Sequence, residues 1–170
     1  LFHSPIPRYL ANSLLVAVSV VIIQVICCAL FTYAVTFMKA KGKNILFRLV
    51  LFTYMVPTAV TYIPCYMILS RLGLLDSYGG LILSNGVSVF GIFLLHQAFA
   101  GVPSETMEAA RMDGAGHLMI LTRIIVPMTR PSFVTFILLS FINTYNSYMW
   151  PSLITDSPDL SLVSQGLRRF

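Results

Sequence analysis

Residues 103–131 read PSETMEAARMDGAGHLMILTRIIVPMTRP, a polar and sharply punctuated segment between two long apolar stretches. Ser104 predicts the N-cap of a short helix, because its side chain can accept a hydrogen bond from a free backbone N–H of the first turn. Glu105 and Glu108 follow near the positive end of the helix dipole, which favours acidic side chains. Asp113 and Gly114 predict the end of this helix, since glycine adopts a positive φ at little cost.

A second short helix is expected over residues 116–126, ending at Pro127, which lacks a backbone donor. The two helices are expected to form a bent helix–turn–helix. Small residues near the turn would let another protein surface approach closely: Ala109, Ala110, Gly114 and Ala115. We interpret the segment as a contact site for another protein. The simpler alternative is an amphipathic connector in which the alanines have no special role.

Outside this segment the chain is dominated by apolar residues. Of its 170 residues, 57% are hydrophobic and 10% are charged, whereas an average soluble domain has about 25% charged residues. Four stretches, residues 12–38, 45–70, 78–100 and 132–154, are long enough to cross a bilayer, which takes about 20 residues per helix. Since unpaired backbone groups are costly in lipid, these spans are expected to be helices. The predicted fold class is an all-α, polytopic transmembrane helical bundle.

The cationic side chains predict which loops face the cytoplasm. They gather in the first loop between spans, with Lys39, Lys41, Lys43 and Arg48, and in the third, with Arg111, Arg123 and Arg130. The positive-inside rule places both loops in the cytoplasm. The second loop, with Arg71 and Asp76, and the stretch after residue 154 then face outward. Arg168 and Arg169 would run against this assignment if nothing followed them. The net charge of +5 reflects this topology and indicates no nucleic-acid partner.

The ends and the cysteines carry further expectations. The sequence begins at Leu1 rather than methionine, and no signal peptide precedes the first span. We therefore expect a fragment, truncated at both ends, that forms a single transmembrane domain over residues 1–170 with a cytoplasmic loop at 101–131. Cys27, Cys28 and Cys65 lie in predicted spans without metal-ligand spacing, and we interpret them as packing residues.

Polar groups and prolines inside the spans have two interpretations. Residues at helical spacing form two stripes, Asn143, Asn146 and Trp150 on the last span, and Ser84, Ser88 and Gly91 on the third with Asn85 adjacent. Asn85, Ser88, Asn143 and Asn146 are candidates for a translocation pathway, since polar groups in lipid are costly. The alternative is interhelical packing, and Trp150 is most simply an interface anchor. Prolines 57 and 64 predict a bend in the second span, either static or a hinge.

The spacing within residues 108–127 also resembles a family signature. Glu108-Ala109-Ala110 is followed by three residues, Gly114, nine residues, Ile124, one residue and Val126-Pro127. This pattern resembles the EAA signature of inner-membrane permease subunits of binding-protein-dependent ABC importers, which reads E-A-A, three residues, G, nine residues, I, one residue, L-P. The one departure is Val126 in place of leucine, which is conservative.

The resemblance extends over about residues 8–151. Residues 8–14, RYLANSL, look like the start of the conserved permease core. Residues 141–151, FINTYNSYMWP, look like the pattern that follows in the carbohydrate-importer branch, close to maltose-type and glycerol-phosphate-type permeases. In that branch a tryptophan often precedes the asparagine, where this chain has Tyr145.

What the resemblance implies is mechanical. In such importers the EAA loop forms a coupling helix that docks in a cleft of a cytoplasmic ATPase, and two ATPases closing on ATP move two permease subunits. Carried over by position, the ATPase-coupling residues are Glu108, Ala109, Ala110, Asp113, Gly114, Ile124 and Pro127. The implied partners are the ATPase dimer, a second permease subunit, an extracytoplasmic solute-binding protein and the lipid bilayer. The resemblance also implies the inner membrane of a prokaryote, six spans in all, and a sugar or polyol as solute.

Two other functional classes compete with this interpretation. A secondary transporter or channel without an ATPase usually carries an intramembrane acid or base, and no Asp, Glu or Lys lies deep in these spans. A membrane enzyme needs a catalytic constellation, whereas helix capping and docking already explain the acid cluster Glu105, Glu108 and Asp113. The sequence contains no G-x-x-x-x-G-K-[ST] motif, so no ATP site is expected in this chain. We also predict no catalytic residue, cofactor or metal.

Overall fold

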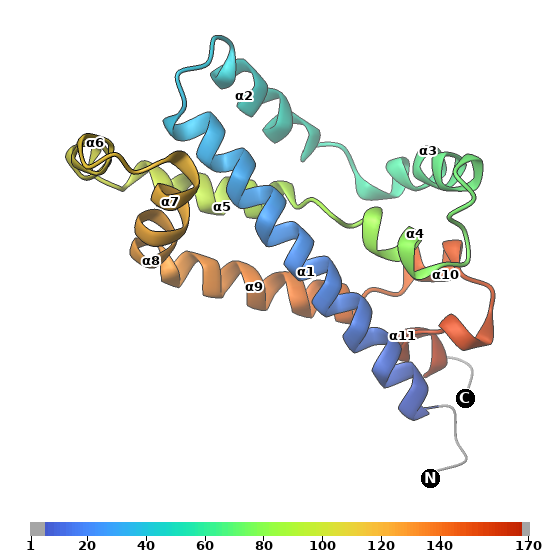
Figure 1. Ribbon diagram of the computed structural model, residues 1–170. Coiled ribbons are helices and arrows are strands. Elements are labelled where there is room, and N and C mark those ends of the chain that lie inside the picture. The colour runs from blue at the N-terminus through green and yellow to red at the C-terminus, as the bar shows by residue number, and fades with distance from the viewer. Residues whose placement is uncertain (1–5, 168–170) are drawn as a thin grey trace. The chain divides into compact units, whose positions relative to one another are not determined.

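The computed structural model describes residues 6–167, and every regular element in this part of the chain is helical (Figure 1). The helices are α1 (Ile6–Phe37), α2 (Lys43–Thr53), α3 (Thr58–Arg71), α4 (Tyr78–Leu83), α5 (Val89–Ala100), α6 (Ser104–Met112), α7 (His117–Ile120), α8 (Val126–Met128), α9 (Arg130–Tyr145), α10 (Met149–Ile154) and α11 (Val163–Gly166). A π-helical turn, Leu121–Ile125, joins α7 to α8, and a 3-10 turn, Pro158–Leu160, follows α10. The all-α class is confirmed. Arg168 and Arg169 lie outside the described residues.

Among residues 6–167, one helix is long and apolar enough to cross a membrane by itself. This is α1, with 32 residues, which covers the first predicted span except for its last residue. The second predicted span is divided between α2 and α3, and the third between α4 and the 12-residue α5. The fourth is divided between α9 and α10. The expectation of a continuous helix is therefore wrong for three of the four spans, and the number of membrane crossings stays a prediction.

Proline explains the break in the second span. α2 ends at Thr53, and Pro57 precedes α3 with φ −58° and ψ 129°. Proline has no N–H to continue a helix, and its ring pushes the preceding residue out of the helical region. Pro64, by contrast, stays inside α3 without ending it. Of the two prolines predicted to bend this span, Pro57 is the one at which the helix is interrupted.

A proline also explains the break in the fourth span. In a continuous helix, the ring of Pro151 would clash with the carbonyl of Ser147, four residues earlier. Instead α9 ends at Tyr145 and α10 begins at Met149. The freed Ser147 carbonyl accepts a hydrogen bond from the Ser164 hydroxyl at 2.6 Å. The break is thus stabilised by a contact from the following segment.

The described residues group into two compact units. The first comprises residues 6–24, Val56–Val87 and 139–167, and the second comprises Val25–Met55 and Ser88–Leu138. Both α1 and α9 contribute residues to each unit. That residues 1–170 form a single domain stays a prediction.

The first unit has a small apolar core and a polar clamp. Val20, Leu81 and Leu162 are almost fully buried in the core. In the clamp, the Asp76 carboxylate accepts hydrogen bonds from the backbone N–H groups of Asp156 and Ser157, both at 3.0 Å, and from the Ser157 hydroxyl. Asp76, which the sequence placed in a solvated outward loop, therefore joins the α3–α4 loop to the segment after α10.

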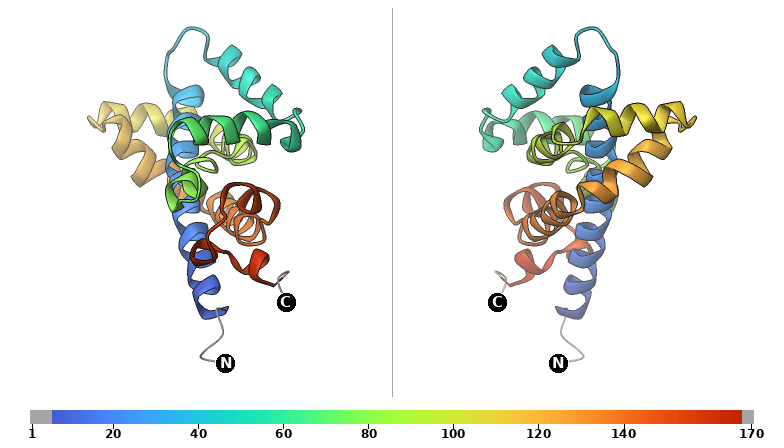
Figure 2. Two further views of the ribbon diagram at one scale, coloured as in Figure 1. Left: turned by 90° about the vertical axis from the view of Figure 1, so that its right-hand side faces the viewer. Right: turned by 90° about the vertical axis from the view of Figure 1, so that its left-hand side faces the viewer.

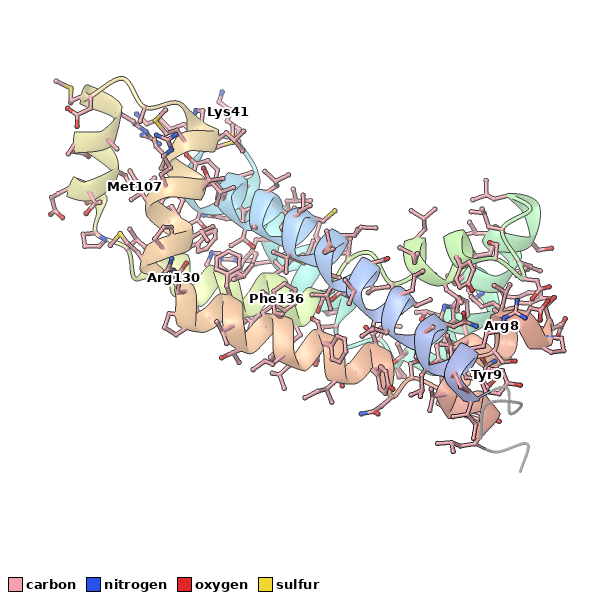
Figure 3. All side chains as sticks on the ribbon, turned by 60° about the horizontal axis from the view of Figure 1, so that its bottom comes forward. Arg8, Tyr9, Lys41, Met107, Arg130 and Phe136 are labelled. Atoms are coloured by element: carbon pink, nitrogen blue, oxygen red, sulfur yellow. The ribbon has the colours of Figure 1, made fainter. Side chains whose placement is uncertain are left out.

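The second unit is packed around aromatic side chains. Phe99 on α5 and Phe136 on α9 have no exposed surface, and Phe133 adds a third buried ring. Gly91 lets α5 approach α9 closely, because a Cβ at this position would overlap the ring of Phe136. Met107 on α6 reaches the same core (Figure 3). The segment that contains the proposed contact site is thus anchored to the second unit.

Candidate functional site

The helix α6 forms the first arm of the segment singled out in the sequence. It begins at Ser104, directly after Pro103, whose φ of −59° and ψ of 135° are extended. Pro103 therefore occupies the N-cap position and no side chain caps the helix. The prediction that Ser104 is the N-cap is wrong by one residue, because the chain is already helical at Ser104. Glu105 lies in the first turn as predicted, where the helix dipole favours it.

Gly114 ends α6 in a Schellman motif, with a φ of +80°. Its N–H donates to the Arg111 carbonyl at 3.0 Å, and the Ala115 N–H donates to the Ala110 carbonyl at 2.9 Å. This pair of bonds satisfies helix-end carbonyls and requires a left-handed residue at the Gly114 position. Apart from Gly114 and its two chain neighbours, no atom of the described residues 6–167 lies within 4 Å of where a Cβ would be. The predicted turn is confirmed, and its outer side is open to a partner.

The two faces of α6 have different surroundings. Met107 and Ala110 are buried in the core, with 3% and 8% of their surface exposed. Glu108 and Ala109 are exposed, and Met112 is 89% exposed. Of the predicted docking residues on this arm, Glu108, Ala109, Asp113 and Gly114 face outward, whereas the methyl group of Ala110 is a packing group.

The second arm runs from His117 to Met128 and forms a bent hairpin with α6 (Figure 2). The prediction that it ends at Pro127 is wrong, because α8 continues through Pro127 to Met128. The π-helical turn Leu121–Ile125 lies just before this proline, and such a widened turn changes the hydrogen-bond pattern where a donor is missing. Pro127 is exposed and Ile124 is half-buried. Both residues belong to the second arm and lie away from the turn at Gly114. The second arm meets α9 at 86°.

Both arms are tied to the end of α1. The Arg111 guanidinium donates to the Phe37 carbonyl at 3.3 Å. The Tyr33 hydroxyl and the His117 Nδ1 are hydrogen-bonded at 2.9 Å, and their rings meet edge to face. His117 carries no motif in the sequence that would mark it as a contact residue. No spacing signal connects it with Tyr33, because the two residues are 84 positions apart.

The two polar stripes predicted inside the spans are not continuous helical faces. Asn143 is exposed on α9, Asn146 is exposed in the break after it, and Trp150 is buried on α10. In the other stripe, Ser84 follows α4, and the Ser88 hydroxyl caps α5 by accepting from the Gly91 N–H at 3.1 Å. Both stripe predictions are wrong, since each assumed one helix where there are two.

Asn85 lies on a cavity of about 160 Å³ within the first unit. The cavity is lined by α3, by the residues that follow α4 and by Ser147 and Trp150. Trp150 Nε1 donates to the Ser84 hydroxyl oxygen at 2.8 Å, and the indole stacks on Tyr62 at a centroid distance of 5.3 Å. Trp150, interpreted from sequence as an interface anchor, is therefore a buried wall of this cavity. Within residues 6–167, no cluster of three or more metal-ligating side chains is present.

Comparison with known proteins adds independent information. The model of a family described as binding-protein-dependent transport system inner membrane component matches residues 25–168. The chain is 32% identical over 165 residues to the sn-glycerol-3-phosphate transport system permease protein UgpE of Yersinia pestis, covering 97% of this chain and 59% of the relative. It is 32% identical over 162 residues to UgpE of Agrobacterium fabrum, covering 95% of this chain and 57% of the relative. The resemblance inferred from the EAA spacing is confirmed.

A solved structure shows the same architecture. The chain superimposes on a chain of a bacterial ABC transporter involved in the import of the acidic polysaccharide alginate, with a TM-score of 0.92 and 26% sequence identity. The match covers 99% of this chain and 60% of that chain. The chain thus spans about three fifths of the length of the curated relatives it matches.

Proposed function

The chain belongs to the family of binding-protein-dependent transport system inner membrane components, and on that premise we propose that it is the transmembrane permease subunit of an ATP-driven ABC importer. Its helices form part of the solute pathway of a multi-pass protein in the inner membrane of a prokaryote. Residues 101–131 couple this pathway to a separate cytoplasmic ATPase.

The observation that carries this proposal is the open turn at Gly114. Its left-handed backbone is fixed by the Schellman bonds, and no other part of the described chain beyond its two neighbours comes within 4 Å of the Cβ position. Exposed Glu108 and Ala109 and the protruding Met112 lie on the same short helix. A small, rigid and partly apolar turn of this kind suits insertion into a cleft of another protein, because its shape is set before binding and little ordering entropy is lost.

The contacts with α1 support a mechanical role. Arg111 links the first arm to Phe37, and His117 links the second arm to Tyr33. Movement of the docked loop would therefore reach the end of α1 through two polar contacts as well as through the buried Met107 and Ala110. Packed interfaces shift between discrete arrangements rather than deforming continuously. A partner that closes on ATP can thus move this helix as a rigid body.

The partners follow from the same proposal. The chain works with a dimer of ATP-binding subunits, a second permease subunit and an extracytoplasmic solute-binding protein. The named relatives belong to sn-glycerol-3-phosphate transport systems, and the solved neighbour imports alginate. Both names support a sugar-like or polyol-like solute for this chain.

Co-purification tests the proposal. The full-length parent protein, tagged and gently solubilised, is expected to bring down an ATPase with a P-loop and a second permease. Gly114→Asp should lower the recovered ATPase about tenfold, because an uncompensated charge would enter the docking cleft. Gly114→Asn is the matched control, since asparagine has the same size and tolerates a left-handed backbone without adding charge.

Recovery of the parent chain alone, in a preparation that still transports solute, would contradict the proposal. The secondary-transporter class would then explain the protein better. Equal ATPase recovery with Gly114→Asp and Gly114→Asn would contradict the assignment of the docking turn while leaving the importer class intact.

A further inference from the structure

The cavity in the first unit contains polar groups that no part of the described chain satisfies. Its volume of about 160 Å³ is enough for roughly five waters at ~30 Å³ each, or for a small polyhydroxylated molecule. Four polar atoms of its lining residues have no hydrogen-bond partner within residues 6–167: Thr58 Oγ1, Tyr62 Oη, Ser147 Oγ and Asn85 Oδ1. Three of these are hydroxyl oxygens and one is an amide carbonyl.

The groups around these atoms are held in place. The Asn85 Nδ2 donates to the Leu81 carbonyl at 2.9 Å, which leaves its Oδ1 as the free end. The Asn85 backbone carbonyl accepts from the Gln24 amide at 2.7 Å. The Ser84 hydroxyl donates to the Gly80 carbonyl at 2.6 Å and accepts from Trp150. The cavity wall is therefore oriented before anything binds, which lowers the entropic cost of recognition.

The chemistry of this lining is neutral. Among the described residues that line the cavity there is no Lys, Arg, Asp or Glu. A phosphate group is usually bound by cations or by charge-assisted donors, whereas a solute hydroxyl both donates and accepts. Hydroxyls of Thr58, Tyr62 and Ser147 can exchange hydrogen bonds in both directions, and the Asn85 carbonyl can accept one. The stacked Tyr62 and Trp150 rings provide an apolar wall for a carbon skeleton.

We infer that this cavity is a solute subsite for an uncharged, hydroxyl-rich group, a polyol or a sugar ring, and that it discriminates against phosphorylated forms. The inference rests on the proposed function, because it places part of the solute pathway at this cavity. It differs from what the name of the UgpE relatives suggests, since their named solute carries a phosphate.

Cys65 provides a native reporter, because it is half-buried and lines the cavity. In the full-length importer, the exposed Cys27 and any cysteine outside residues 1–170 are replaced by alanine. Cys28 is kept, because it is fully buried and the reagent cannot reach it. The rate of Cys65 modification by N-ethylmaleimide is then measured with two matched pairs of probes, glycerol against sn-glycerol 3-phosphate and glucose against glucose 6-phosphate.

A neutral member of at least one pair is expected to slow the modification of Cys65, and its phosphorylated partner is expected to leave the rate unchanged. Thr58→Val and Ser147→Ala should each raise the half-protecting concentration about three- to tenfold, the loss expected for one neutral hydrogen bond. Ser152→Ala on α10 is the control, because this exposed serine does not line the cavity.

Protection by the phosphorylated probes equal to that by the neutral ones, or no protection by any of the four, would overturn the inference. ATPase co-purification is measured on the same samples. Retained ATPase without protection of Cys65 would remove the subsite alone, whereas loss of the ATPase would remove the proposed function.

Discussion

Single residues shape the loops at the helix ends. Gly114 and Gly73 both have a positive φ and both follow helices that end in Schellman bonds. Asp76 also has a left-handed backbone, with a φ of 50°, and is the one non-glycine residue of this kind among the described residues. Its carboxylate offsets that strain by accepting three hydrogen bonds from residues 156 and 157. Asp76 is therefore a structural residue of the loop.

The protonation of Asp76 gives a pH-dependent prediction. The hydroxyl of Ser157, followed by its backbone N–H, holds the pKa of Asp76 below its ordinary value of 3.8. A carboxyl with a lowered pKa stabilises the folded state above the unfolded pKa, and this contribution is lost as the pH falls through the folded pKa. Asp76→Asn should therefore lower the thermal unfolding midpoint of the full-length protein at neutral pH. The two proteins should converge as the pH falls well below 3.8.

Asparagine is a suitable replacement here, since it tolerates the left-handed backbone. Its neutral side chain has one accepting oxygen in place of the two charged oxygens of the carboxylate. A stability difference that stays constant from neutral to strongly acidic pH would show that the charge of Asp76 contributes nothing.

At the scale of elements, the packing of α5 on α9 depends on one glycine. A Cβ at Gly91 would overlap the ring of Phe136, which has no exposed surface. Gly91→Ala should destabilise the protein by about 1–3 kcal/mol, the usual cost of overpacking. In the Phe136→Leu background the same substitution should cost less, because the ring is gone. Unfolding midpoints of the four proteins in this cycle measure the coupling, and strictly additive effects would argue against the contact.

The link between α1 and the second arm gives a functional prediction. Tyr33→Phe keeps the ring that packs on His117 and removes the hydroxyl of the 2.9 Å hydrogen bond. Such a bond is worth about 0.5–1.5 kcal/mol, so transport per ATP hydrolysed should fall about two- to tenfold. The ATPase should still co-purify. Tyr54→Phe, at an exposed tyrosine, is the matched control. Unchanged coupling in Tyr33→Phe would show that this contact transmits no motion.

The helix–turn–helix of residues 103–131 was predictable from sequence because its signals are local. Gly114 fixes the turn through its own backbone, and the acidic residues before it favour a helix start. The prediction of the two polar stripes was wrong because it applied a helical period across residues at which the helix is interrupted. The Pro151 ring excludes a helical position for the Ser147 carbonyl. That carbonyl instead accepts a hydrogen bond from Ser164, which lies 17 residues further along the chain. The contact between Tyr33 and His117 is tertiary, and no local pattern encodes it.

At the scale of the whole molecule, the proposed function makes this chain the part of the importer that an ATPase moves. Its described residues form two compact units, and the second unit carries the exposed turn at Gly114. The first unit carries the neutral cavity. The proposed function places the coupling at the turn, and the further inference places a solute subsite at the cavity. Under the proposed function, the turn at Gly114 docks on an ATPase.

Site-specific crosslinking tests this claim most directly. In the full-length assembled importer, cysteine is placed at the exposed Ala109 on α6 or, as a control, at the exposed Thr135 on α9. A short bifunctional thiol reagent should join Ala109→Cys to the ATPase subunit, while Thr135→Cys should give no such product. Equal yields from the two positions, or no crosslink from Ala109→Cys in an intact complex, would contradict the account.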